Sequence, residues 1–148
     1  MNKLKIIITF FVLLCISCSK KSEIESIFIT SENEYWAYRD YCWNSKGNYY
    51  KYNKNGTCDK FALYTHEGFV LYNNDGDDEF IGSSWSIKND STFVFNYEEY
   101  KIEKISNQEI LLSYYHYKIK DKKCFVRLTK WVNGPEGPKP LDSVKGKE

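Results

Sequence analysis

Apolar and polar residues alternate in short runs between Glu34 and Trp131, and turn-forming residues separate the runs. Near the middle of the chain, for example, Ile81, Trp85 and Ile87 fall on one face of an extended segment. Alternation of period two is typical of half-buried β-strands, whereas no segment of about ten residues shows a convincing helical period. We therefore expect about nine short strands, at residues 34–43, 48–53, 57–65, 69–72, 80–88, 91–96, 100–105, 110–120 and 123–131.

The turns between these runs fix the fold class. Lys54-Asn55-Gly56 is a strong hairpin signal, because Asn-Gly readily supplies two residues with positive φ. Many short strands at even spacing are typical of barrels and sandwiches. The pattern predicts an all-β fold, a single up-and-down antiparallel β-barrel of about eight or nine strands. The alternative is an open two-sheet β-sandwich.

The N-terminus has the pattern of an export signal. Lys3 and Lys5 precede an apolar run, residues 6–16, which is too short to span a bilayer unaided. The following Ser17-Cys18 resembles the end of a bacterial lipobox, with a small residue before the cysteine that takes the lipid. We expect cleavage before Cys18 and acylation of its thiol, which would anchor the chain in a membrane. The alternative is an ordinary secretory signal cut near Ser17.

These features divide the chain into four parts. Residues 1–17 are the predicted signal peptide, 18–33 a lipidated tether, 34–131 the β domain and 132–148 a flexible tail that contains all three prolines. The residues after Cys18 lack the acidic run that often marks surface export in the bacterial group that the signal resembles. We therefore expect an outer-membrane lipoprotein of the cell envelope that faces the periplasm rather than the outside.

Composition narrows the function classes. The chain has 21 basic and 20 acidic residues, and removal of Lys3 and Lys5 leaves it close to neutral. A nucleic-acid partner is not expected, because such a partner requires a basic surface. Aromatic residues make up 18% of the chain, with 13 Tyr and 9 Phe, and this content favours strands.

Three cysteines follow the predicted cleavage site in the β domain, which allows at most one intramolecular disulfide. Cys42 and Cys58 lie on neighbouring predicted strands and are the expected pair in an oxidising envelope. The alternative is that both, together with Cys124, are buried thiols that act as small hydrophobic groups. These three cysteines include no Cys-x-x-Cys pair, which speaks against a zinc or redox motif in the β domain.

Five segments show the strand rhythm and anchor residues of a known family: Gly82–Ile87, Ser91–Phe95, Tyr100–Ile102, Ile110–Leu112 and Cys124–Leu128. Together they resemble the lipocalin-like domains of Bacteroidetes lipoproteins, and the resemblance extends over residues 36–130. It implies an up-and-down barrel with an apolar interior, in which Trp36 on the first strand and Arg127 on the last strand close the floor by a cation–π contact.

The sequence contains no motif for catalysis or for a cofactor. The acidic run 73–79 lacks the Gly and Glu positions of an EF-hand, so a solvated turn is expected there rather than a metal site. The two histidines, His66 and His116, have no catalytic partner within their own segments. We expect a protein that is not an enzyme and that binds no metal or cofactor.

The aromatic strands leave three possibilities open. Inward rings could line a cavity for a small apolar ligand, outward rings could form a contact surface, or the rings could simply fill a small barrel. We predict a membrane-anchored, non-catalytic binder of a small apolar ligand, or a scaffold of unknown role. The alternative is a protein-interaction lipoprotein, such as an inhibitor or an accessory subunit of an envelope complex. The candidate cavity residues are Trp85, Phe93, Phe95, Tyr114 and His116.

Overall fold

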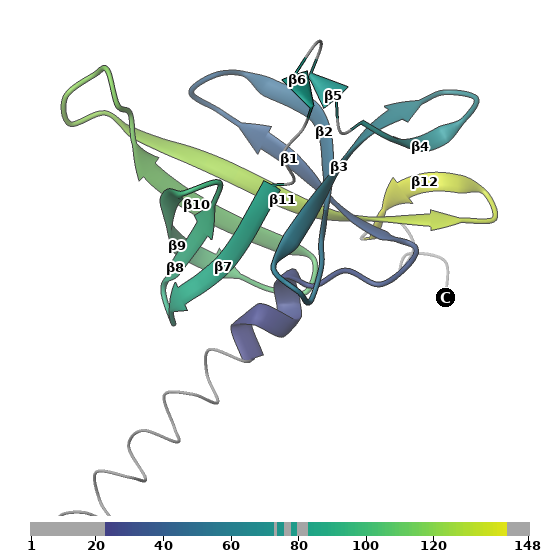
Figure 1. Cartoon of the computed structure of the whole chain (residues 1–148), viewed down its shortest axis with the longest axis horizontal. Helices are drawn as coiled ribbons and strands as arrows, with labels where there is room; N and C mark the ends of the chain where they lie inside the picture. Colours follow the sequence, from purple (N-terminus) through teal and green to yellow (C-terminus); the bar gives the residue numbers. More distant parts are fainter. Residues whose placement is uncertain (1–22, 73, 76–77, 80–82, 142–148) are drawn as a thin grey trace, which may run out of the picture.

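The computed structural model describes residues 23–72, 74–75, 78–79 and 83–141 (Figure 1). The predicted signal peptide and its lipidation site Cys18 lie outside the described residues. The described chain contains one short helical segment, residues 23–28, followed by twelve strands. The strands are β1 (Glu34–Asp40), β2 (Ser45–Tyr52), β3 (Thr57–Tyr64), β4 (Gly68–Leu71), β5 (Asn74–Asp75), β6 (Asp78–Glu79), β7 (Ser83–Asn89), β8 (Thr92–Phe95), β9 (Glu98–Ile105), β10 (Glu109–Tyr115), β11 (Lys123–Gly134) and β12 (Gly137–Pro140).

Eight of these strands form a closed antiparallel barrel. The order is β1-β2-β3-β7-β8-β9-β10-β11, and β11 returns to pair with β1 over the full length from Glu34↔Val132 to Asp40↔Val126. Each barrel strand thus pairs with the next one along the barrel, which is up-and-down topology. The barrel prediction is confirmed, and closure excludes the open sandwich.

Strands β3 and β7 close one side of the barrel. Among the described residues, they pair at Thr57↔Ser84 and Cys58↔Ser83. The second half of β3 turns away to pair with β4, and β5 and β6 form a small separate hairpin. The end of β11 pairs in the same manner with β12 outside the barrel. The structure is therefore a closed barrel with two extra hairpins on its wall.

The predicted Asn-Gly turn joins β2 to β3. Gly56 has φ +84°, a left-handed conformation that glycine adopts without steric cost. A Cβ at this position would lie 3.4 Å from the carbonyl oxygen of Trp85, so the turn also packs closely against β7.

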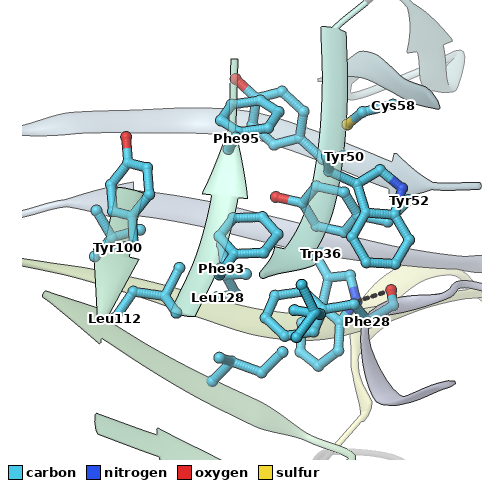
Figure 2. Packing of buried hydrophobic residues seen from close by; sticks show 14 residues of the cluster. Phe28, Trp36, Tyr50, Tyr52, Cys58, Phe93, Phe95, Tyr100, Leu112 and Leu128 are labelled. Atoms are coloured by element: carbon cyan, nitrogen blue, oxygen red, sulfur yellow. Dashed lines mark hydrogen bonds between the residues drawn. The ribbon is translucent and has the colours of Figure 1, made fainter. Parts of the chain in front are cut away.

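The interior is filled largely by aromatic side chains, as the alternation predicts. A residue that precedes the barrel, Phe28, is fully buried among them, with its ring centroid 4.5 Å from that of Phe93 and 5.9 Å from that of Trp85. In Figure 2 the indole N–H of Trp36 donates to the Phe28 carbonyl oxygen, at 2.8 Å. The buried cluster consists of Phe28, Trp36, Tyr50, Tyr52, Cys58, Trp85, Ile87, Phe93, Phe95, Tyr100, Ile110, Leu112, Val126 and Leu128.

The segment that carries Phe28 is more than a tether. Ile24, Ile27 and Phe28 share one face of the helical turn at spacings of three and four residues, and all three pack against the barrel core. Burial of a phenylalanine ring contributes about 1.5–3 kcal/mol, and the packing of Ile24 and Ile27 adds to it, so tertiary contacts hold this short helix in place. Within the predicted tether 18–33, residues 23–28 are therefore a helical segment that docks on the barrel.

The predicted flexible tail is also partly wrong. β11 continues to Gly134, and β12 returns along it, with Trp131 opposite Pro140. Proline is tolerated in β12 because this is an edge strand, where the missing N–H removes no interior hydrogen bond. Residues 142–148 lie outside the described residues.

A second aromatic cluster lies on the outer face of the barrel. Tyr35 stacks on Phe69 at 3.9 Å between ring centroids and contacts Phe61 edge-on at 5.1 Å. Tyr49 contacts Phe69 at 4.9 Å and Trp131 at 5.4 Å. The hairpins that contain β4 and β12 supply part of this cluster and touch each other, so the two extra hairpins hold each other against the wall.

Candidate functional site

The two ends of the barrel differ in what they present. The helical segment 23–28 packs at one end, while the β1–β2 and β10–β11 connections project beyond the opposite end (Figure 1). We call this opposite end the rim end. Several exposed aromatic side chains lie there.

We define the aromatic rim as Tyr41, Trp43, Tyr115, His116 and Tyr117, from the β1–β2 connection and the end of β10. His116 stacks on Trp43 at 4.8 Å between ring centroids and on Tyr117 at 5.4 Å, with nearly parallel planes in both cases. Tyr115 and Tyr117 are 70% and 73% exposed, and Trp43 is 51% exposed. Large hydrophobic groups left in water in one place are typical of a binding surface.

A disulfide braces the rim. Cys42 bonds to Cys124 at the start of β11, at a sequence separation of 82. The predicted Cys42–Cys58 pair is wrong: Cys58 is a free, buried thiol that lies opposite Tyr52 in the β2–β3 register. Barrel closure places β11 beside β1, so Cys124 lies within reach of Cys42. Distance along the chain does not predict this contact.

The Asp40 side chain fixes the backbone at the start of the rim by hydrogen bonds. This carboxylate is almost fully buried, and its Oδ1 accepts the backbone N–H groups of Cys42 at 2.7 Å and Trp43 at 3.2 Å. Its Oδ2 accepts the hydroxyl of Tyr114 at 2.8 Å. The β1–β2 connection that carries Trp43 is thereby tied to the inner face of β10.

Tyrosine hydroxyls continue this polar layer into the barrel. The Tyr100 hydroxyl donates to Glu98 at 2.8 Å. Burial raises the pKa of Tyr100 and of Tyr38, and the nearby carboxylates Glu98 and Asp40 respectively add to the effect. Burial, then the hydrogen bond to Asp40, raises the pKa of Tyr114. These hydroxyls therefore stay protonated and act as neutral hydrogen-bond donors at ordinary pH.

Two hollows lie beside the rim. One, of about 220 Å³, is lined by Glu98, Glu99, Tyr114, Tyr115 and Tyr117. The other, of about 320 Å³, shares Glu99, Tyr114 and Tyr115 with it and extends over the outer face of β9 and β10 toward Lys101 and Lys123. At the opposite end of the barrel, a groove of about 630 Å³ runs between the helical segment and the β2–β3 turn, with Ile29 and Trp85 in its lining.

The structure does not place all five predicted cavity residues in one site. Trp85, Phe93 and Phe95 belong to the buried core, and Tyr114 packs against it. His116, in contrast, lies after the end of β10 and is part of the aromatic rim. The strand that we predicted to run to residue 120 ends at Tyr115, so the alternation no longer directs His116 inward.

Side chains occupy the space around the buried candidates. Phe93 stacks on Phe28 at 4.5 Å, and Tyr52 contacts Phe93 at 5.6 Å and Trp85 at 5.5 Å. The Tyr52 hydroxyl is fully buried and has no hydrogen-bond partner among the described residues. Such a buried group is uncommon in folded proteins and calls for an explanation.

The predicted closure of the barrel floor is half correct. Trp36 is fully buried in the floor, but the cation over its ring is Lys130, with Nζ 4.7 Å from the ring centroid. Lys130 is opposite Trp36 in the β1–β11 register and is ion-paired with Glu34 at 3.6 Å. Burial lowers the pKa of Lys130, and Glu34 opposes the effect.

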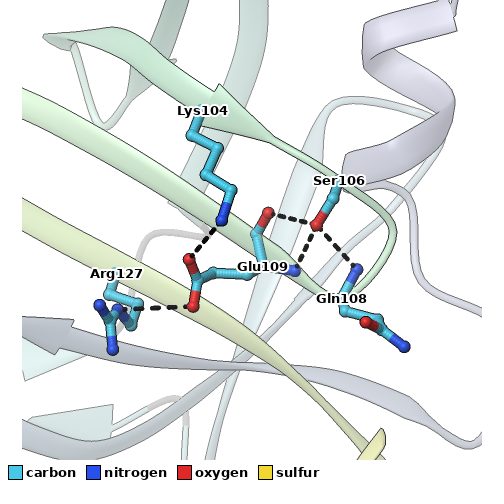
Figure 3. A network of polar contacts seen from close by, with 5 residues as sticks. All are labelled: Lys104, Ser106, Gln108, Glu109 and Arg127. Carbon is cyan, nitrogen blue, oxygen red and sulfur yellow. Dashed lines mark hydrogen bonds and ion pairs between the residues drawn. The ribbon is translucent and has the colours of Figure 1, made fainter. Parts of the chain in front are cut away.

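Arg127 lies on the outer face instead. Figure 3 shows its guanidinium beside Glu109, which also contacts Lys104. The distance from Arg127 Nε to Glu109 Oε2 is 3.7 Å. Val126 and Leu128 point inward on either side of Arg127, so the alternation of β11 already excludes it from the interior.

The aromatic run that contains Tyr115 and Tyr117 was among those whose outward rings could form a contact surface, and His116 was a cavity candidate, but Tyr41 and Trp43 were not predicted to join them. Trp43, Tyr115 and Tyr117 lay inside predicted strands that proved too long. Asn44, with φ +50°, marks the turn after Trp43. The Asp121-Lys122 turn was expected, but nothing in the residues 116–120 signalled that the strand ends before them.

Within the described parts of the chain, no group of three or more His, Cys, Asp and Glu side chains is placed to hold a metal ion. A helix long and apolar enough to cross a membrane is likewise missing from these residues. Comparison of the chain with family models, with curated proteins and with solved structures found no match.

Proposed function

We propose that this protein is an envelope lipoprotein, anchored through Cys18, whose barrel is a non-catalytic binding module that takes its ligand at the aromatic rim. The observation that carries the proposal is the rim itself. Three large, exposed aromatic side chains stand at one end of the barrel beside two hollows. A disulfide and a buried carboxylate fix the backbone beneath them.

The rim is pre-organised, which favours binding. The stacked series Trp43–His116–Tyr117 and the Asp40 hydrogen bonds restrict these side chains before any ligand arrives. Ordering a mobile side chain on binding costs about 0.5–1.5 kcal/mol, so rings that are already held lose less. Tyrosine and tryptophan are also the residues most often found at binding hot spots.

The place of the rim agrees with an anchor at Cys18. The chain enters the barrel at the end where residues 23–28 pack, and the rim occupies the other end (Figure 1). With Cys18 in the outer membrane, the rim would face into the periplasm, toward soluble ligands or a partner of an envelope complex. The interaction-protein alternative thus uses the same surface as the proposed function.

A small apolar ligand inside the barrel is the second candidate. The observation in its favour is the buried Tyr52 hydroxyl, which has no partner in the described part of the chain, because a ligand with a polar end would satisfy it. The aromatic packing around Phe93 counts against it, since a ligand would have to displace rings that are in contact.

Native mass spectrometry of the protein purified from its own host tests both candidates. We expect a bound species on the wild type that is lost in a Tyr115→Ala/Tyr117→Ala variant. The matched control is Tyr64→Ala/Tyr72→Ala, which removes two exposed tyrosines outside the rim. A bound molecule that survives the rim variant but is lost in Phe95→Ala would favour the interior site instead.

The anchor is tested separately by feeding cells labelled palmitate. We expect incorporation into the wild type and none into Cys18→Ala, which should also leave the membrane fraction. A wild-type protein that takes up no label would contradict the anchor and leave the rim to be judged by the binding experiment.

A further inference from the structure

The hollow of about 220 Å³ at the rim has an unusual lining, three tyrosines and two glutamates. It lies where β9 and β10 separate, because their register pairs end at Lys101↔Ser113. Glu98 and Glu99 begin β9 on one side, and Tyr114, Tyr115 and Tyr117 end β10 on the other. Aromatic faces and carboxylates are therefore brought together in one small space.

The charges in this hollow leave one carboxylate without a counter-ion. Glu99 forms an ion pair with Lys88 at 2.6 Å. Glu98 accepts a hydrogen bond from the neutral hydroxyl of Tyr100, and no cation pairs with it among the described residues. The buried Asp40 below is likewise held by Tyr114 and backbone N–H groups rather than by a cation.

The aromatic faces are suited to a positive charge. The ring quadrupole attracts cations, and a ring with a carboxylate nearby attracts them more strongly. The chain itself illustrates this, because Lys118 Nζ lies over the Tyr117 ring at 5.2 Å from the centroid. Tyr117 is also fixed by its parallel stack on His116, so its face needs little reorganisation.

We propose that this hollow binds a small organic cation, an alkylammonium head group held by the faces of Tyr115 and Tyr117 and by the charge of Glu98. The inference deepens the proposed function and rests on it, since it names the ligand class for the rim. The size agrees with a head group rather than a larger molecule, because pockets for drug-sized ligands measure about 300–1,000 Å³. A ligand would displace Lys118 from Tyr117 by rotation of that exposed side chain.

Calorimetric titration of the full chain in a maltoside detergent tests the inference, with choline as the probe. Its neutral isostere 3,3-dimethylbutan-1-ol, which has the same shape without the charge, is the control ligand. We expect choline to bind and the isostere to bind at least tenfold more weakly. Tyr117→Ala should weaken choline binding about 3- to 30-fold, and Glu98→Gln should weaken it and reduce its salt dependence.

The matched control variants are Tyr64→Ala and Glu67→Gln, exposed residues of the β3–β4 hairpin that should leave binding unchanged. A further arm compares choline with phosphocholine. Tighter binding of choline assigns the site to a free cation, and tighter binding of phosphocholine assigns it to the head group of a lipid. Both results support a cation site.

Equal binding of choline and its isostere would overturn the cation inference while leaving the rim as an apolar binding surface. Absence of choline binding would also overturn it, and the mass-spectrometric test of the rim would then decide the proposed function on its own. Binding that Tyr117→Ala and Glu98→Gln leave unchanged would place the cation elsewhere and equally contradict the inference.

Discussion

Two tyrosines inside the barrel differ in whether the hydroxyl has a hydrogen-bond partner. The Tyr114 hydroxyl donates to the buried carboxylate of Asp40, whereas the fully buried Tyr52 hydroxyl finds no partner in the portion of the chain that the structure describes. A hydrogen bond to a charged group contributes about 1.5–3 kcal/mol, and a buried unsatisfied group costs about 1–3 kcal/mol. The same Tyr→Phe substitution should therefore have opposite effects at the two positions.

We expect Tyr114→Phe to lower the free energy of unfolding by about 1–2 kcal/mol, because Asp40 keeps its two backbone donors. Tyr52→Phe should be neutral or stabilising. Chemical denaturation of both variants measures the difference. If Tyr52→Phe were as destabilising as Tyr114→Phe, its hydroxyl would have a partner in solution, and the interior-ligand candidate would gain support.

For single residues, prediction from the sequence was correct where the alternation of a strand alone determines whether a side chain points inward. It placed Trp85, Phe93 and Phe95 with the inward residues, and the core contains them. It was wrong for Arg127, which was assigned by resemblance against the alternation of its own strand. Lys130 shares the inward period with Val126 and Leu128, and its register opposite Trp36 could be found only after the barrel was closed.

Strands β9, β10 and β11 are linked on their outer face by one carboxylate. Glu103 Oε1 accepts from Lys123 Nζ at 2.6 Å and from the Ser113 hydroxyl at 2.7 Å, and Oε2 accepts from Lys101 Nζ at 3.2 Å. These hydrogen bonds, with Lys123 the largest contributor, lower the pKa of Glu103 to about 2. The network joins three neighbouring strands through one side chain.

A lowered pKa in the folded state means that Glu103 stabilises the fold above its unfolded pKa of about 4.3. This contribution should be lost as the pH falls toward about 2. We expect the melting temperature of the wild type to exceed that of Glu103→Gln at pH 6, and the gap to shrink between about pH 4.5 and 2. Glu67→Gln is the control. A gap that does not change with pH would contradict the network.

The disulfide acts between elements, because it joins the β1–β2 connection to the start of β11. A bridge across 82 residues removes much of the freedom of the unfolded chain, and loss of a native disulfide typically costs about 2–5 kcal/mol. We expect a Cys42→Ser/Cys124→Ser variant to lose stability in this range and to bind rim ligands more weakly. Alkylation in denaturant without reductant should label Cys58 and spare Cys42 and Cys124. A Cys42–Cys58 peptide in the digest would refute this pairing.

Most barrel strands could be predicted because each is a local pattern between turn residues. The element missed at the N-terminus, residues 23–28, is shorter than the window that reveals a helical period, although Ile24, Ile27 and Phe28 show the spacing. β12 was missed because prolines suggested a flexible tail, while its pairing partner is an extension of β11 that only the folded barrel makes available. The rim depends on where strands stop, which alternation describes poorly.

The two ends of the molecule differ in structure. The chain enters beside the helical segment, and Phe28 fills the barrel from that end, while the braced loops and their aromatic side chains stand at the other. Five residue steps from Cys18 to Glu23 reach at most about 18 Å. An acylated Cys18 would therefore hold the filled end of the barrel near the bilayer and leave the rim directed away from it.

Lipid proximity measured at two matched surface lysines tests this orientation. Lys54 lies in the β2–β3 turn beside the helical segment, and Lys120 lies in the β10–β11 connection at the rim end; both are exposed. A thiol-reactive fluorophore on Lys54→Cys or Lys120→Cys should label only the new cysteine, because Cys42 and Cys124 are bonded and Cys58 is buried. In vesicles that contain lipids with spin-labelled head groups, we expect strong quenching at position 54 and weak quenching at position 120. The Cys18→Ala substitution removes the acyl group and should abolish the quenching at both positions. Stronger quenching at position 120 would place the rim against the membrane, which would exclude a soluble periplasmic ligand there and make the bilayer itself the surface that the aromatic side chains meet.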